Sequence, residues 1–97
     1  MQSVTDVFDA LAAEARRLIL DELAERDGQA LYELCARLTM KRGLTLTRQA
    51  ISQHLEVLEA AGLVRSVREG RYKFHYIDTA PLDEAVARWR RTPEEDE

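Results

Sequence analysis

The chain has 97 residues, a net charge of −4 and a single cysteine. This length fits one domain, placed here at residues 1–91, and a domain so small often draws stability from a second subunit. One cysteine excludes an internal disulfide and a cysteine-rich zinc site. No apolar run approaches the roughly 20 residues of a membrane span, and the N-terminus lacks the pattern of a secretory signal. We therefore expect a cytoplasmic protein.

The charge is distributed unevenly along the chain. Residues 1–39 carry four basic and eight acidic residues, and residues 78–97 carry three and seven, so each segment has a balance of −4. Residues 40–77 carry seven basic and three acidic residues, a balance of +4. A basic middle segment is the electrostatic footprint that binding to nucleic-acid phosphates requires. A chance fluctuation on a solvated face is the alternative.

Hydrophobic periodicity predicts three helices in the first half of the chain. The first begins behind a candidate cap, Ser3 or Thr5, and its apolar residues are Val4, Val7, Phe8 and Leu11. The second ends before Gly28, and its apolar residues are Ala15, Leu18, Ile19 and Leu23. The third runs from about Ala30 toward Gly43, and its apolar residues are Leu31, Leu34, Cys35 and Leu38.

A fourth helix, with Thr47 as its N-cap, has two different faces. Its apolar face has helical spacing and comprises Ile51, Leu55, Leu58 and Gly62. The opposite face carries Gln49, Ser52 and Gln53 near the N-terminal end, short polar groups of the kind that reach base edges in a DNA major groove. Arg48, in the first turn, is placed for a phosphate or a guanine. The pattern predicts a recognition helix.

Two further residues of this helix refine the prediction. His54 lies beside the apolar face, where we expect it to pack half-buried or to contact a phosphate rather than to bind a ligand. Glu56 faces outward and would repel phosphate, so we expect only the first two turns to enter the DNA groove.

Two β-prone runs follow, Leu63–Val67 and Tyr72–Ile77, joined by a turn at residues 68–71 that contains Gly70. They predict a two-stranded wing. In the second run basic residues alternate with aromatic residues, so one face is basic and the other aromatic. We expect the aromatic face to pack on the recognition helix. The basic residues expected to reach phosphates or an adjacent minor groove are Arg68, Arg71 and Lys73. A solvated hairpin tip is the alternative.

A last helix opens at Thr79-Ala80-Pro81 and is predicted to run to Arg91, before Thr92-Pro93. Its apolar residues are Leu82, Ala85, Val86 and Trp89. Residues 92–97 are mostly acidic and have no apolar side chain to bury, which predicts a disordered tail. The predicted fold is mainly α with a small β-hairpin, in the order α-α-α-α-β-β-α.

This order resembles the winged helix-turn-helix of the arsenic-repressor-like (ArsR-like) family of bacterial transcription regulators, over residues 8–89 and most closely over residues 47–77. The resemblance implies a homodimeric, sequence-specific DNA-binding repressor with a palindromic operator and no enzymatic activity. The residues implied to contact DNA are Thr47, Arg48, Gln49, Ser52, Gln53, His54, Arg68, Arg71 and Lys73. The first and last helices would pair across a two-fold axis through Val4, Phe8, Leu11, Leu82, Val86 and Trp89. Packing of both stripes within one monomer is the alternative.

The chain departs from the metal-sensing members of that family. Leu31–Leu34 stands where they carry a Cys-x-Cys-Asp signature, and the last helix has no histidine for their other known site. We therefore expect no metal and no other cofactor, with Cys35 as a small core residue. The connection Met40–Leu46 is longer than usual, through either a longer third helix or a bulged loop, and would offer Lys41 and Arg42 to a further phosphate.

Two other classes of function stay open at this point. One is a protein-interaction module within a larger assembly. The basic middle segment disfavours this alternative. The other is a repressor that responds to a small ligand or to a redox change, for which the sequence shows no convergent polar groups and only the thiol of Cys35. No arrangement of residues with the spacing of a catalytic site is present.

Overall fold

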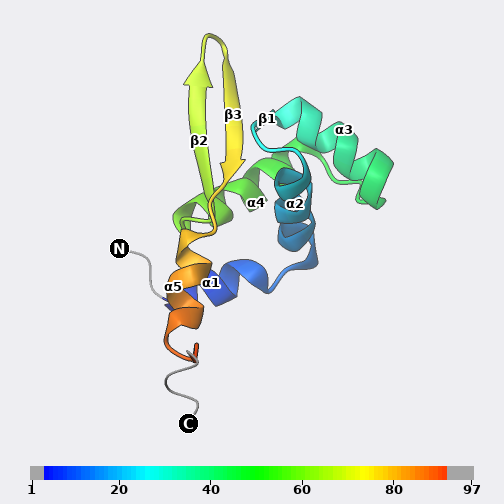
Figure 1. The fold of residues 1–97 in the computed structure, drawn as a ribbon. Coiled ribbons are helices and arrows are strands. Elements are labelled where there is room, and N and C mark those ends of the chain that lie inside the picture. The colour runs from blue at the N-terminus through cyan, green and yellow to red at the C-terminus, as the bar shows by residue number, and fades with distance from the viewer. Residues whose placement is uncertain (1–3, 92–97) are drawn as a thin grey trace.

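The computed structural model describes residues 4–91, with side chains described from Val7 onward. The elements in chain order are α1 (Val4–Leu11), α2 (Glu14–Glu25), β1 (Gln29–Ala30), α3 (Leu31–Arg42), α4 (Arg48–Ala60), β2 (Val64–Glu69), β3 (Tyr72–Ile77) and α5 (Ala80–Ala87). The hairpin of β2 and β3 projects from the helical body, and α1 and α5 lie together at the end away from the hairpin tip (Figure 1). This mainly helical architecture with a small sheet confirms the predicted fold class.

The sheet has one strand more than the hairpin predicted from the sequence. Its order is β1-β3-β2 with antiparallel pairing, and Gln29 of β1 lies opposite His75 of β3. A strand of two residues is too short to show any periodicity, so the sequence pattern did not reveal it. Gly28 leads into this strand with φ +74°, and a β carbon there would lie 2.7 Å from the ring of Tyr76. Gly28 therefore turns the chain into β1, whereas α2 already ends at Glu25.

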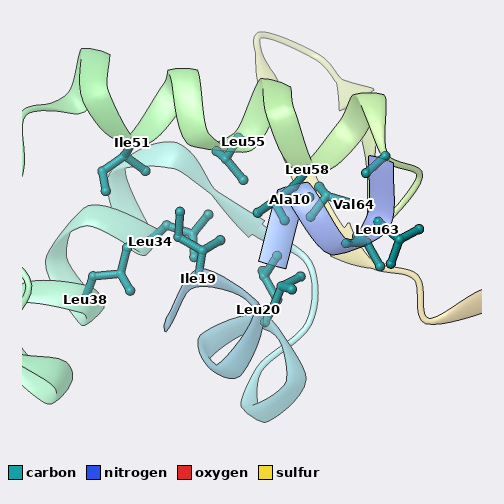
Figure 2. Packing of buried hydrophobic residues seen from close by; sticks show 13 residues of the cluster. Ala10, Ile19, Leu20, Leu34, Leu38, Ile51, Leu55, Leu58, Leu63 and Val64 are labelled. Carbon is teal, nitrogen blue, oxygen red and sulfur yellow. The ribbon is translucent and has the colours of Figure 1, made fainter. Parts of the chain in front are cut away.

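The core forms where the apolar faces of the helices meet beneath α4. In Figure 2 the α4 stripe points toward residues of α1, α2 and α3 and toward the start of β2. The labelled residues of this core are Ala10, Ile19, Leu20, Leu34, Leu38, Ile51, Leu55, Leu58, Leu63 and Val64. Burying each large aliphatic side chain contributes about 1.5–3 kcal/mol. The predicted apolar stripe is confirmed at Ile51, Leu55 and Leu58, whereas Gly62 lies beyond the end of α4 at Ala60, with φ +79°.

Local signals determine where α3 ends and α4 begins. Gly43 follows α3 in the left-handed conformation, at φ +67°, and the backbone N–H of Leu44 donates to the carbonyl of Leu38 at 3.0 Å. The long connection predicted from the sequence is thus partly helix, which continues to Arg42, and partly the loop 43–47. The Oγ1 of Thr47 accepts the N–H of Ala50 at 3.0 Å, which confirms Thr47 as the N-cap of α4.

The prediction that the last helix reaches Arg91 was wrong, because α5 ends at Ala87. The following turn holds Trp89, which is 61% exposed, so burial of this apolar side chain within the monomer does not stabilise another helical turn. At the other terminus, Ser3 lies outside the described residues, and Thr5 lies within α1 rather than before it.

A buried carboxylate, missed in the sequence, ties α2 to α3. The side chain of Glu22 is fully buried and accepts hydrogen bonds from Arg37, from Gln29 Nε2 at 3.1 Å and from Arg42 Nε at 3.2 Å. Burial opposes its ionisation, but these hydrogen bonds and the charge of Arg37 prevail and lower the pKa of Glu22 below its ordinary value. We call these four residues the Glu22 cluster.

Glu22 and the neighbouring Glu25 together bind the two cations of α3 that were expected to contact DNA. Lys41 Nζ lies 2.7 Å from Glu25 Oε2, and Arg42 binds both Glu25, at 2.8 Å, and Glu22. The basic last turn of the longer α3 therefore packs against the acidic residues of α2.

Replacing Glu22 should destabilise the fold. We expect Glu22→Ala to lower the free energy of unfolding by about 3 kcal/mol, because Arg37 loses its carboxylate partner in a largely buried site and Arg42 keeps only its bond to Glu25. The matched control is Glu25→Ala, whose side chain is 48% exposed and whose loss should matter far less. Urea unfolding of the three proteins measures both effects, and equal losses for the two variants would contradict the role given to Glu22.

Candidate nucleic-acid interface

The packing of α4 determines which of its side chains reach solvent. Because the apolar stripe faces the core, Gln49 and Gln53 point outward and are exposed, and Ser52 between them is half-buried. Thr47 and Arg48 are exposed at the start of the helix. The structure thus brings together, on the first two turns of α4, the polar residues that the sequence analysis proposed for reading bases.

The basic residues divide into those that are paired within the chain and those that are not. Most arginines outside this region bind a carboxylate, a backbone carbonyl or an aromatic ring, as Arg16 and Arg37 do. Among the residues that the structure describes, the basic side chains without any hydrogen bond, ion pair or ring contact are Arg48, Arg68, Arg71, Lys73 and Arg90. Four of these five lie at the start of α4 or on the wing.

The wing carries three of these unpaired cations at its outer end. Its turn consists of Gly70 and Arg71, since Glu69 of β2 pairs with Tyr72 of β3. Gly70 has φ +64°, a conformation that favours glycine at the first position of a two-residue hairpin loop. The four-residue turn predicted from the sequence is therefore shorter. Arg68 belongs to β2 and lies directly opposite Lys73.

The prediction that the aromatic face of the wing packs on the recognition helix was wrong. The other face is turned toward α4, since Ser66 Oγ donates to Glu59 Oε2 of α4 at 2.9 Å and lies opposite His75. Because side chains alternate along a strand, the aromatic residues point to the opposite side of the sheet. There the Tyr72 ring lies 6.1 Å from the Tyr32 ring, centroid to centroid. Alternation alone predicted two faces but not which one meets α4.

His75 joins the wing to the end of the recognition helix. Its Nδ1 lies 2.8 Å from Ser66 Oγ, and the hydroxyl hydrogen of Ser66 goes to Glu59, so we assign the Nδ1 hydrogen as the donor in the first contact. His75 is 5% exposed. Burial lowers the pKa of His75 below its ordinary 6.5, the nearby carboxylate of Glu59 opposes this, and Lys73 adds to it. At neutral pH the imidazole is therefore uncharged, with its hydrogen assigned to Nδ1.

His54 occupies the half-buried position predicted for it. Arg16 Nη1 lies 3.3 Å from His54 Nδ1, and the same arginine donates to the carbonyls of Ala10, at 2.7 Å, and Asp9, at 3.2 Å. Burial lowers the pKa of His54, and the positive charge of Arg16 lowers it further. Within the monomer this histidine connects α4 to the α1–α2 corner, and its contact with phosphate stays a prediction.

The proposed dimer face presents three of its apolar side chains to solvent. Phe8 is 47% exposed, Val86 43% and Trp89 61%. Leu11 and Leu82 are instead half-buried and pack against the core of the same chain. The side chain of Val4 lies outside the described residues. The exposed part of the proposed face is thus Phe8, Val86 and Trp89, at the end of the molecule where α1 and α5 are in contact, and its role in a dimer stays a prediction.

Cys35 is half-buried against the core, in agreement with the prediction of a packing residue. Burial raises the pKa of its thiol, and the charge of Arg48 acts in the opposite direction. Over the side chains that the structure describes, no three histidine, cysteine, aspartate or glutamate residues gather as a metal site would require. No described helix combines the length and apolarity needed to cross a bilayer.

Sequence reasoning missed several residues around this interface. Glu59, Ser66 and Tyr32 carry no motif, and only their tertiary contacts give them a role. Glu22 did leave a signal, because it falls three residues after Ile19 on the face that α2 buries, where an unpaired charge would be costly.

Comparison with known proteins gives consistent matches. The model of a helix-turn-helix domain family matches residues 11–67. An HTH-type transcriptional regulator of Bacillus subtilis (strain 168), YuzN, is 51% identical over 83 residues, which cover 86% of this chain and 90% of that protein.

Solved structures agree with these relatives. An ArsR-like transcriptional regulator from Rhodococcus sp. RHA1 has a TM-score of 0.74 and 36% identity, with 88% of this chain and 74% of that chain covered. A homodimeric winged helix-turn-helix DNA-binding domain from Mycobacterium bovis has a TM-score of 0.66 and 31% identity, with 87% and 69% covered.

The buried histidine of the wing should make stability depend on pH. In the unfolded chain His75 binds a proton below its ordinary pKa of 6.5, whereas the folded chain resists that proton to lower pH. The free energy of unfolding should therefore fall as the pH drops below 6.5, until the folded-state pKa is passed.

Urea unfolding at several pH values between about 8 and 5 measures this slope. His75→Gln should flatten the curve in part, and adding His54→Gln should flatten it further, because the pKa of His54 is also lowered. Identical slopes for the wild type and His75→Gln would show that His75 titrates normally.

Proposed function

Because the chain belongs to the ArsR-like family of winged helix-turn-helix transcription regulators, we propose that it is a homodimeric repressor. It binds a palindromic operator by inserting α4 into the major groove and laying the wing along the flanking backbone, and it does so without a metal ion. The observation that carries this proposal is the segregation of the unpaired cations to the first turn of α4 and the wing.

The electrostatic argument rests on which cations are available. An arginine already bound to a carboxylate gains little from a phosphate, because it must give up one acceptor for another. Arg48, Arg71 and Lys73 have no such partner among the described residues, so each is free to neutralise a phosphate and release a counterion. The net charge of −4 is then no obstacle to binding, because residues 40–77, which carry these cations, have a balance of +4.

Sequence recognition is assigned to the exposed polar side chains of α4. Gln49 and Gln53 lie one turn apart on its outer face, and a glutamine amide pairs in bidentate fashion with adenine. Ser52 and Thr47 supply hydroxyl groups on the same turns, although the Oγ1 of Thr47 already accepts a backbone hydrogen bond. Glu56, one turn further, is exposed and repels phosphate, so it limits how deeply the helix enters.

The dimer is supported by the exposed aromatic surface beside the α1–α5 contact. Phe8 and Trp89 present more apolar area than isolated surface residues usually do, and a two-fold axis would bury the same patch on both subunits. The related domain from Mycobacterium bovis is homodimeric. Two α4 helices related by such an axis would address two half-sites of a palindrome.

The two parts of the DNA contact should respond differently to substitution. Gln49→Ala or Gln53→Ala should weaken operator binding by about 1–3 kcal/mol and change binding to a scrambled duplex little, because these side chains contact base edges. Arg71→Ala or Lys73→Ala should weaken binding to both duplexes and reduce the salt dependence, because each removes a phosphate contact. Fluorescence anisotropy titrations at several salt concentrations measure both quantities.

Lys41→Ala serves as the matched control, since Lys41 is bound to Glu25 and should leave the salt dependence unchanged. The titrations are repeated with a chelator and with zinc, and the operator affinity should be the same. Equal loss of operator and scrambled DNA in the glutamine variants would show that α4 does not read sequence. A failure of the wild type to retain any genomic fragment would instead favour a protein-interaction module.

Removing the exposed indole should weaken the dimer more than the monomer fold. We expect Trp89→Ala to reduce the dimerisation free energy by about 2–4 kcal/mol, as for a large aromatic residue at the centre of an interface. Met40→Ala is the control, because Met40 is 83% exposed on α3, away from the α1–α5 end. Sedimentation equilibrium measures the association constants. A monomeric wild type at micromolar concentration would refute the dimer.

A further inference from the structure

A groove separates the wing from α4 and from the start of α3. It has a volume of about 330 Å³, and its lining residues come from the start of α3, from α4 and from the hairpin turn and β3. This volume is at the lower end of the range for small-molecule sites. Most of its lining lies outside the base-reading face: only Ser52 and Arg48 belong to the α4 residues assigned to DNA.

Cations without partners line this groove. Arg48, Arg71 and Lys73 all contribute to it, and none has a hydrogen bond or ion pair with a described residue. The opposing carboxylates are Glu56 and Glu59, and Glu59 is already hydrogen-bonded to Ser66. The groove therefore has unused positive charge at the wing side and one unused carboxylate, Glu56, at the helix side.

Two exposed tyrosine rings line this groove at the edge of β3 that β1 leaves uncovered, with Tyr72 on the face of the wing turned away from α4 and Lys73 on the face turned toward it. Tyr32 from the first turn of α3 and Tyr72 from the start of β3 both line the groove, with exposures of 52% and 50%. Their ring centroids are 6.1 Å apart and the ring planes are tilted by 55°. Such a pair offers an aromatic surface on which a flat ring can stack.

We propose that this groove binds a small hydroxylated aromatic carboxylate and that the bound molecule excludes DNA. Its ring lies against Tyr32 and Tyr72, its carboxylate is bound by Arg71 and Lys73 through charge-assisted hydrogen bonds, and its hydroxyl donates to Glu56. The exclusion of DNA rests on the proposed function, whereas the binding of the molecule does not.

Competition follows from the residues that the two ligands share. Arg48 and Lys73 are needed for phosphates, and a carboxylate in the groove neutralises cations that DNA would otherwise use. The bound ring also covers the side of Ser52, between the two glutamines that read bases. A molecule with equal affinity for the free and DNA-bound protein would change nothing, so this overlap is what makes the groove regulatory.

The test begins with the free protein and three probes: hydroxynaphthoate, naphthol, which lacks the carboxylate, and hydroxycyclohexanecarboxylate, which lacks the aromatic ring. Amide chemical shifts are followed during each titration. Hydroxynaphthoate should shift residues 30–32, 48–56 and 71–75 saturably, and each other probe should bind about tenfold more weakly, because it lacks either the charge or the stacking surface.

Variants then locate the site. Tyr72→Ala should weaken hydroxynaphthoate binding about tenfold and Tyr72→Phe should preserve it, because stacking needs the ring and not its hydroxyl. Arg68→Ala is the control for ligand binding, since Arg68 is an unpaired wing cation that does not line the groove. Equal binding of all three probes, shifts elsewhere, or equal losses in Tyr72→Ala and Arg68→Ala would overturn the site.

Operator titrations of the same protein complete the test. Hydroxynaphthoate should weaken operator affinity by the factor that its concentration and its dissociation constant predict for competitive binding. The Tyr72→Ala variant should need more hydroxynaphthoate for the same effect, in proportion to its weaker binding of the probe. Unchanged operator affinity at saturation would overturn the competition. Absence of operator binding without any probe would instead overturn the proposed function, and the shift titrations would still decide whether the groove binds the molecule.

Discussion

The direction in which α4 buries its apolar stripe determines which residues of this protein can meet DNA. Ile51, Leu55 and Leu58 are at most 2% exposed, and each contributes roughly 1.5–3 kcal/mol by its burial. Rotating the helix by one residue, about 100°, would carry polar side chains into the core. The cap at Thr47 and the left-handed Gly43 fix where the helix starts along its axis. Core packing thus orients the reading face before any DNA is present.

The charge of the middle segment is divided between two tasks. Lys41 and Arg42, at the end of α3, neutralise Glu22 and Glu25 of α2 and hold the two helices together. The cations of residues 48–77 bind no carboxylate among the described residues, and Arg65 lies over the ring of Tyr76 instead. A count of charges along the sequence therefore indicates the same surface as the unpaired cations do, but it overstates how much of the charge is available to DNA.

Features encoded by neighbouring residues could be predicted from the sequence. The stripes of α2, α3 and α4, the cap at Thr47 and the hairpin at Gly70 each depend on spacing or conformation within one segment. Features that depend on a distant segment could not. Strand β1 exists because β3 supplies its partners, and Glu22 is buried because α3 brings arginines to it. The face of the wing that meets α4 likewise depends on the distant pairing of Ser66 with Glu59.

That pairing gives the wing a fixed base and a free tip. Ser66 and His75 tie both strands to the last turn of α4, close to the body of the protein. At the other end, Gly70 and Arg71 lack any comparable contact among the described side chains. Phosphate contacts position a protein on DNA and base contacts specify the sequence. A wing held at its base keeps its register relative to the recognition helix, while its tip can follow a backbone whose path varies with sequence.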